Sequence, residues 1–242
     1  MLVAVVGGCA DEKKATTESF GSETTQKLEN EPDGAAEPNE DPPTTTTTQA
    51  SEEPTVVDAG FSTYPALDET WATAGAVIAN PSSESFAFVE VVFTLKAAGK
   101  PIATETSYVD LLPANGEAYA NVDIIQNLTA TPDEIEVTVV TNEDGIFSDP
   151  EDYPALPLTV TGVSADDFGA KVTGTIKNPT DEVLSSTTIS CVMTSAGKIV
   201  GGIAGYADTL APGGEIAWEA TNTFEGVAFD AAKCSAAGDL SM

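Results

Sequence analysis

The residues best able to do chemistry in this 242-residue chain are three cysteines, because the chain contains no histidine. Histidine is the commonest general base in enzymes and a frequent metal ligand. Without it, neither a Ser-His-Asp or Cys-His catalytic site nor a histidine-containing zinc site can be built. One cysteine, Cys9, lies near the N-terminus, and the other two, Cys191 and Cys234, lie far along the chain.

The N-terminal cysteine follows a short apolar segment that ends in small residues. The segment Val5-Val6-Gly7-Gly8-Cys9 resembles the lipobox of bacterial and archaeal lipoproteins. The resemblance implies that residues 1–9 are a signal remnant, that Cys9 carries a thioether-linked diacylglycerol, and that the protein is anchored to the extracytoplasmic face of the cell membrane. The alternative is an apolar terminus with a chance cysteine. No run of about 20 apolar residues follows, so we expect no membrane-spanning helix.

The two remaining cysteines are candidates for a disulfide. If Cys9 is lipidated, Cys191 and Cys234 form an even pair in an exported domain, where disulfides persist. Such a bond stabilises a fold by about 2–4 kcal/mol where the geometry permits it. The alternative is two separate buried thiols, which pack as small apolar side chains. We favour the disulfide.

Acidic residues gather between residues 142 and 152. Asp144, Asp149 and Asp152 belong to this group, and carboxylates are ligands that Ca²⁺ prefers. Their spacing does not match an EF-hand loop, which needs a glutamate at its last position. We therefore favour a solvated acidic linker over a Ca²⁺ site, and we expect no other cofactor.

The remaining carboxylates do not suggest an enzyme. Pairs such as Asp68-Glu69 are neighbours in sequence, whereas a glycosidase needs two carboxylates that face each other across the scissile bond. We expect no catalytic activity. A separate motif, Asn127-Leu128-Thr129, matches the acceptor sequence for N-glycosylation in hosts that carry out this reaction.

The net charge of the chain is −30, from 39 acidic residues against 9 basic ones. Such a charge repels phosphate backbones, so we do not expect nucleic acid as a partner. It favours solubility and basic or cationic partners, and it is also compatible with a host that lives at high salt.

Residues 10–55 differ in composition from the rest of the chain. Thr, Glu and Pro dominate, and Phe20 is the single aromatic residue. Such a segment buries too little apolar surface to offset its ordering entropy, so we expect a disordered acidic linker.

The rest of the chain is a tandem duplication. Asn80-Pro81 recurs as Asn178-Pro179, and Ala98-Gly99-Lys100 recurs as Ala196-Gly197-Lys198, both at an offset of 98 residues. At the same offset, 11 of the 38 positions in residues 80–117 are identical. A gapless offset also makes Phe93 and Glu136 the equivalents of Cys191 and Cys234. We therefore expect two domains, residues 56–148 and residues 149–242.

Each repeat is predicted to be all-β, because short runs of alternating apolar residues are broken by Gly, Pro, Asn and Asp. Six or seven such strands favour an immunoglobulin-like β-sandwich, with a barrel as the alternative. In the second repeat the expected strands are Leu158–Val163, Ala170–Ile176, Thr187–Met193, Ile199–Tyr206, Glu215–Ala220 and Phe229–Ala236.

Several repeated motifs resemble the FxLYD-type domain, which occurs in prokaryotic lipoproteins and surface proteins. They are Gly174-Thr175-Ile176-Lys177-Asn178-Pro179, Phe93-Thr94-Leu95, Leu112-Pro113 and Gly116-Glu117. The chain departs from the family at Lys96-Ala97, where the pattern has Tyr-Asp, and at Cys191-Val192-Met193. The resemblance implies an immunoglobulin-like fold and no catalytic residues.

Together these features predict a lipid-anchored surface lipoprotein that is a non-catalytic binding or structural module. The expected partners are the membrane, through Cys9, and another envelope protein or a glycan. The alternatives are a substrate-capturing lipoprotein that serves a membrane transporter and, less favoured, a carboxylate-based envelope hydrolase.

Overall fold

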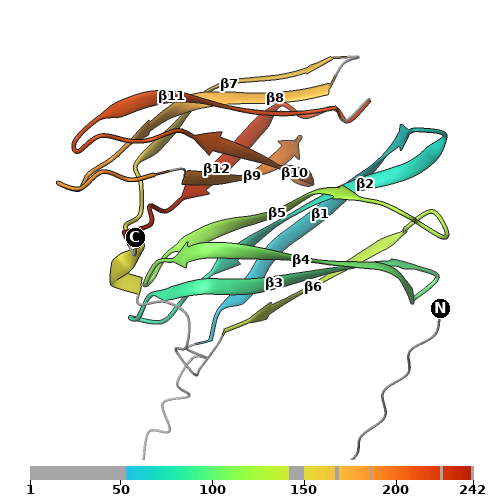
Figure 1. The fold of residues 1–242 in the computed structure, drawn as a ribbon. Coiled ribbons are helices and arrows are strands. Elements are labelled where there is room, and N and C mark those ends of the chain that lie inside the picture. The colour runs from blue at the N-terminus through green and yellow to red at the C-terminus, as the bar shows by residue number, and fades with distance from the viewer. Residues whose placement is uncertain (1–52, 142–149, 167–168, 186, 224–225, 241–242) are drawn as a thin grey trace, which may run out of the picture. The chain divides into compact units, whose positions relative to one another are not determined.

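The structure is a computed structural model that describes residues 53–141, 150–166, 169–185, 187–223 and 226–240. These residues form twelve strands in antiparallel sheets and one short 3-10 helix, η1 (Pro150–Asp152). The expected all-β class is therefore confirmed. Figure 1 shows the first repeat in blue to yellow-green and the second in yellow to red. Within the described part of the chain, a helix with the length and apolarity needed to span a bilayer is absent.

The first repeat contains two three-stranded sheets, ordered β1-β2-β5 and β4-β3-β6. Its core is built from alternate residues of each strand, because successive side chains of a strand point to opposite faces. In β3, for example, Val91, Phe93 and Leu95 are fully buried, and the residues between them are only partly buried. The strands are β1 (Thr55–Ala66), β2 (Glu69–Ala79), β3 (Phe86–Ala97), β4 (Lys100–Leu112), β5 (Glu117–Ile125) and β6 (Glu134–Val140).

The second repeat forms one six-stranded sheet in the order β12-β9-β10-β11-β8-β7. A single residue pair, Tyr206 with Glu219, joins β10 to β11 and so connects two halves that are separate sheets in the first repeat. At the other edge, an isolated bridge between Ala155 and Ala237 brings the start and the end of the repeat together. The strands are β7 (Leu158–Asp166), β8 (Gly169–Lys177), β9 (Thr187–Ser195), β10 (Lys198–Ala207), β11 (Glu215–Asn222) and β12 (Ala231–Ala236).

The expectation of two immunoglobulin-like sandwiches is therefore met only at a coarser level. Both repeats are antiparallel and all-β, but the second is a near-closed, barrel-like sheet. The physical reason is the pair Tyr206–Glu219, which links the two halves on one side, while the Ala155–Ala237 bridge does so on the other. The expected boundary between residues 148 and 149 lies outside the described residues.

Residue pairing follows the repeat up to the last strand. Thr94 pairs with Thr104 in the first repeat, and the residues 98 positions further along, Val192 and Gly202, pair with each other in the second. Phe93, however, pairs with Val137, whereas Cys191 pairs with Cys234. The equivalent of Cys234 is therefore Val137, and the prediction of Glu136 was wrong. The extra residue of the first repeat lies in β5, whose pairing with β2 is irregular between Val122 and Ile125, whereas β11 pairs with β8 without a break. A shift of one residue exchanges the two faces of a strand.

The repeated Asn-Pro motif is a structural clamp. The buried side-chain amide of Asn178 donates to the carbonyl oxygens of Glu182 (2.8 Å) and Leu210 (3.1 Å), and its oxygen accepts from the backbone N–H of Thr180 (2.9 Å). Asn80 makes the same bonds with the equivalent segments of the first repeat. Because buried polar groups are costly when unpaired, this clamp explains why both repeats keep the residue.

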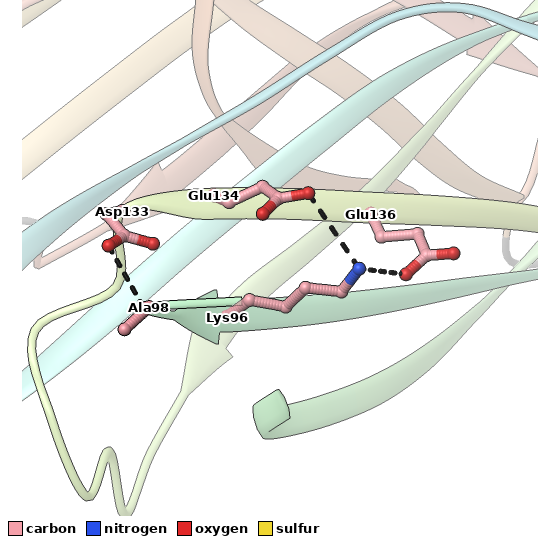
Figure 2. Close-up of polar contacts among 5 residues, drawn as sticks. All are labelled: Lys96, Ala98, Asp133, Glu134 and Glu136. Atoms are coloured by element: carbon pink, nitrogen blue, oxygen red, sulfur yellow. Dashed lines mark hydrogen bonds and ion pairs between the residues drawn. The ribbon is translucent and has the colours of Figure 1, made fainter. Parts of the chain in front are cut away.

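The repeated Ala-Gly-Lys motif forms the turn between β3 and β4. Ala98 (φ 49°) and Gly99 (φ 72°) both have left-handed backbone angles, as a tight hairpin turn requires. The Asp133 side chain accepts a hydrogen bond from the Ala98 N–H at 3.1 Å, as Figure 2 shows. Asp230 does the same for Ala196 at 3.0 Å in the second repeat. The motif is therefore explained by turn geometry.

Candidate functional site at the interface between the repeats

The most elaborate polar arrangement in the described residues lies where the two repeats meet. The outer face of β2 and β5 packs against the outer face of β9 and β10. We call this contact the inter-repeat interface. Its small apolar centre consists of Val77 from the first repeat and Val192 and Ile199 from the second, with Tyr119 against them.

Glycines allow the two backbones to approach closely. A β-carbon added at Gly75 would lie 2.5 Å from the carbonyl oxygen of Gly201. One added at Gly202 would collide with the Asn121 side chain, and one at Gly60 would collide with the backbone of Ile199. Each repeat also has an outer sheet face that does not meet the other repeat, which we call its free face. At the equivalent positions on these free faces, Thr173 stands in place of Gly75 and Thr104 in place of Gly202. The equivalent of Gly60 is again a glycine, Gly162, so it is Gly75 and Gly202 that occur only on the two faces that meet.

Thr73 connects the two repeats by hydrogen bonds at the centre of the interface. Its hydroxyl is fully buried, donates to the carbonyl oxygen of Gly202 at 2.8 Å, and accepts from the Gly202 N–H at 3.1 Å. A single side chain thus satisfies both backbone groups of one residue in the other repeat. On the free face of the second repeat the equivalent residue is Lys171, which forms an ion pair with Glu219.

A carboxylate lies at the edge of the same contact. Asp123 accepts a hydrogen bond from the Ala204 N–H of the second repeat at 2.8 Å and another from the Asn121 amide at 2.6 Å. Burial raises the pKa of the Asp123 carboxyl, and these hydrogen bonds, together with one from Asn222, offset the effect only in part. The interface therefore holds a carboxylate whose charged form is disfavoured.

A second carboxylate lies beside a narrow crevice of about 20 Å³ between the repeats. Burial raises the pKa of Asp110, and the negative charge of Asp239 from the second repeat raises it further. Nearby, the hydroxyl of Ser235 accepts a hydrogen bond from the Tyr119 N–H at 3.1 Å. The polar contacts between the repeats thus extend from Asp123 to Asp110.

The tip of the β1–β2 hairpin extends this contact into the second core. Tyr64 is 3% exposed and belongs to the apolar cluster of the second repeat, against which Trp71 also packs. The two rings meet edge to face, with centroids 6.4 Å apart. Burial, with a smaller effect from the charge of Asp123, raises the pKa of Tyr64 to about 12. The first repeat thus supplies part of the core of the second.

These groups form a joint between two folded units. Hydroxyl and carboxylate groups form hydrogen bonds with backbone atoms of the other repeat. The described residues contain no group of three or more Cys, Asp or Glu side chains placed to hold a metal ion. The arrangement can hold two sheets in one orientation, since each polar group specifies its partner across the contact.

The sequence-predicted site residues fall in different places. Cys9, Asp144 and Asp149 lie outside the described residues. Asp152 ends η1, and its backbone carbonyl accepts a hydrogen bond from the Leu240 N–H at 2.9 Å. Cys191 and Cys234 form a disulfide that joins directly paired residues of β9 and β12. The disulfide lies against the core of the second repeat, on the face opposite to the inter-repeat interface.

One open cleft lies at the end of the first repeat where the β1–β2 turn is found. Its volume is about 510 Å³, and it is lined by Glu69 and Thr70 of β2 and by residues 127–131 of the β5–β6 connection. The lining is mainly polar and includes Asn127 and Thr129 of the glycosylation motif.

Sequence reasoning missed the residues of the inter-repeat interface, above all Thr73, Asp123 and Gly202. A usable signal was present in the comparison of the repeats. At the equivalent positions the other repeat carries Lys171, Thr221 and Thr104, so the two copies differ in size and charge at these sites while keeping the same clamps and turns.

Comparison with known proteins does not assign the chain to a family. A scan against protein-family models returned no match. A search of curated proteins likewise found no similar sequence.

Proposed function

We propose that this chain is a lipid-anchored surface protein whose two repeats act as one non-catalytic head for binding or structural support. In this proposal Cys9 carries the lipid, residues 10–55 are the spacer, and the repeats are FxLYD-type, immunoglobulin-like modules. The protein lies on the extracytoplasmic face of the membrane.

The observation that carries the proposal is the inter-repeat interface. Two independent domains on a linker would be expected to expose polar outer faces to solvent. Here Thr73 and Asp123 instead bond to backbone groups of the second repeat, and glycines bring the two sheets together. Such a joint suits a head that presents its loops in a fixed arrangement, and the lipobox motif supports the anchor.

Metabolic labelling with a fatty acid in the native host tests the anchor. The wild-type protein is expected to carry label and to sediment with membranes, whereas Cys9→Ser is expected to lose both properties. The double variant Cys191→Ala/Cys234→Ala is the matched control, because it removes two cysteines and leaves the lipobox intact. Label that persists in Cys9→Ser would refute the anchor.

A further inference from the structure

The glycosylation motif of the β5–β6 connection has a structural setting that its sequence alone does not reveal. Asn127 and Thr129 are both exposed, while Leu128 between them packs against the core of the first repeat. This partly buried leucine holds the connection against the core, with the acceptor amide and the threonine hydroxyl outward. Both groups that a glycosyltransferase must reach are therefore accessible in the folded chain.

The amide of Asn127 also differs from the buried asparagine amides. The side chains of Asn80, Asn121 and Asn178 are buried and donate hydrogen bonds. Among the described residues, none forms a hydrogen bond with the side chain of Asn127. It has a left-handed backbone (φ 56°) and lies in the irregular connection between β5 and β6, outside any strand pairing. The nitrogen is thus available for covalent modification without loss of an internal contact.

The cleft beside the motif provides space and polar partners for a sugar. It has a volume of about 510 Å³, and Thr70, Thr131 and the carboxylate-bearing Glu69 line it together with the motif. Hydroxyl and carboxylate groups are suitable hydrogen-bond partners for sugar hydroxyls. A glycan on Asn127 would therefore have its first residues beside a polar surface.

We propose that Asn127 is an N-glycan acceptor and that the adjacent cleft contacts the first sugars; this rests on the proposed export of the chain. The donor is a lipid-linked oligosaccharide phosphate. The amide nitrogen of Asn127 forms a bond to the anomeric carbon, the bond between that carbon and the phosphate oxygen breaks, and the lipid phosphate leaves with the electron pair. The nitrogen loses one proton to a base of the transferase.

The site lies at the end of the first repeat opposite to Thr55, where β1 begins. Strand β1 starts at Thr55, next to the spacer, and pairs with β2 so that Ala66 meets Glu69 at the other end. A strand of 12 residues spans roughly 35–40 Å. The glycan would thus lie near the end of β1 that is farther from Thr55.

Peptide mass spectrometry on full-length protein purified from the native host tests the proposal. We expect a hexose-containing mass increment on the peptide with Asn127, its loss in Asn127→Gln and in Thr129→Ala, and its retention in Thr129→Ser. Asn115→Gln is the control, because Asn115 is exposed but precedes Gly116-Glu117 and lacks the motif.

The outcomes separate this proposal from the proposed function. An unmodified Asn127 in protein whose Cys9 carries lipid would overturn the glycan and leave the anchor in place. A modified Asn127 in protein without lipid would support the glycan and refute the anchor. An increment that survives in both Asn127→Gln and Thr129→Ala would overturn the assignment to this site.

Discussion

Asp123 shows how one residue makes the interface sensitive to pH. Its charged form is disfavoured because it is largely removed from water, although it accepts hydrogen bonds from Ala204 and Asn121. A carboxyl whose pKa is raised on folding binds its proton more tightly in the folded state. The free energy of unfolding therefore gains from this group as the pH falls through its raised pKa.

The variant Asp123→Asn tests this reasoning. Asparagine has the shape of the neutral acid and can still accept from the Ala204 N–H, so we expect the melting temperature at pH 7 to rise by a few degrees. The difference from the wild type should shrink as the pH is lowered and Asp123 becomes protonated. Glu117→Gln is the control, because it removes an equal charge from an exposed position. A lower melting temperature for Asp123→Asn at pH 7 would show that the charged form is the stabilising one.

Asn178 is a residue whose loss should be costly. Asn178→Ala removes two donated hydrogen bonds and leaves the carbonyl oxygens of Glu182 and Leu210 without these donors. We expect the free energy of unfolding to fall by about 2–4 kcal/mol, measured by chemical denaturation. Glu182→Ala should change it by less than about 0.5 kcal/mol, because only the backbone of Glu182 takes part in the clamp. Equal effects of the two substitutions would argue against the clamp.

At the scale of strands, the close approach of β2 and β10 depends on their glycines. The variant Gly202→Ala places a methyl group against Asn121 and the carbonyl oxygen of Ala74, which is 2.6 Å from the added carbon. We expect a loss of about 1–3 kcal/mol in the free energy of unfolding, the usual cost of overpacking.

The first repeat provides the control for this substitution. Thr104 occupies the equivalent position on an exposed face, so Thr104→Ala should cost less than about 1 kcal/mol. Both variants are compared by denaturant unfolding followed through tryptophan fluorescence. If Gly202→Ala is as stable as Thr104→Ala, the backbones are not held in close contact.

The disulfide links β9 and β12 at a position where the first repeat has two apolar side chains. Phe93 and Val137 occupy the equivalent pair in β3 and β6, so the bond is an addition to the shared fold. The double variant Cys191→Ala/Cys234→Ala should lose about 2–4 kcal/mol of stability. Reduction of the wild type should produce a similar fall in the unfolding midpoint. An unchanged midpoint under both treatments would show that the bond does not stabilise the fold.

For the whole molecule, the net charge of −30 predicts a dependence on salt. Like charges repel each other in the compact state, and the screening length falls from about 30 Å at 0.01 M salt to about 3 Å at 1 M. We expect the melting temperature to rise by several degrees over this range of sodium chloride. Differential scanning calorimetry at constant pH measures the change. A falling melting temperature would show that attractive ion pairs, such as Lys96 with Glu134 and Glu136, outweigh the repulsion.

The sequence predicted the strands well because the alternation of apolar residues is a local property, and it revealed the repeats because identical residues recur at a fixed offset. Alternating apolar residues gave each strand of the second repeat, and the Asn-Pro and Ala-Gly-Lys motifs marked the clamps and turns. The shift at β12 was missed because the one additional residue in β5 leaves the apolar pattern of the last strand unchanged. The interface was missed because Thr73 and Gly202 are 129 positions apart, and no short-range pattern links them.

The inter-repeat interface joins the outer face of β2 and β5 in the first copy to the outer face of β9 and β10 in the second. Because these faces are not equivalent in the two copies, the contact is asymmetric. Each copy retains one outer face that does not meet the other repeat. Those two faces carry ion pairs, and threonines stand there in place of Gly75 and Gly202. Exchanging the order of the copies along the chain would bring the charged faces together and leave the glycine-bearing ones in water. After the duplication, then, the two copies lost their equivalence: each became fitted to its own place, first or second, and neither can substitute for the other.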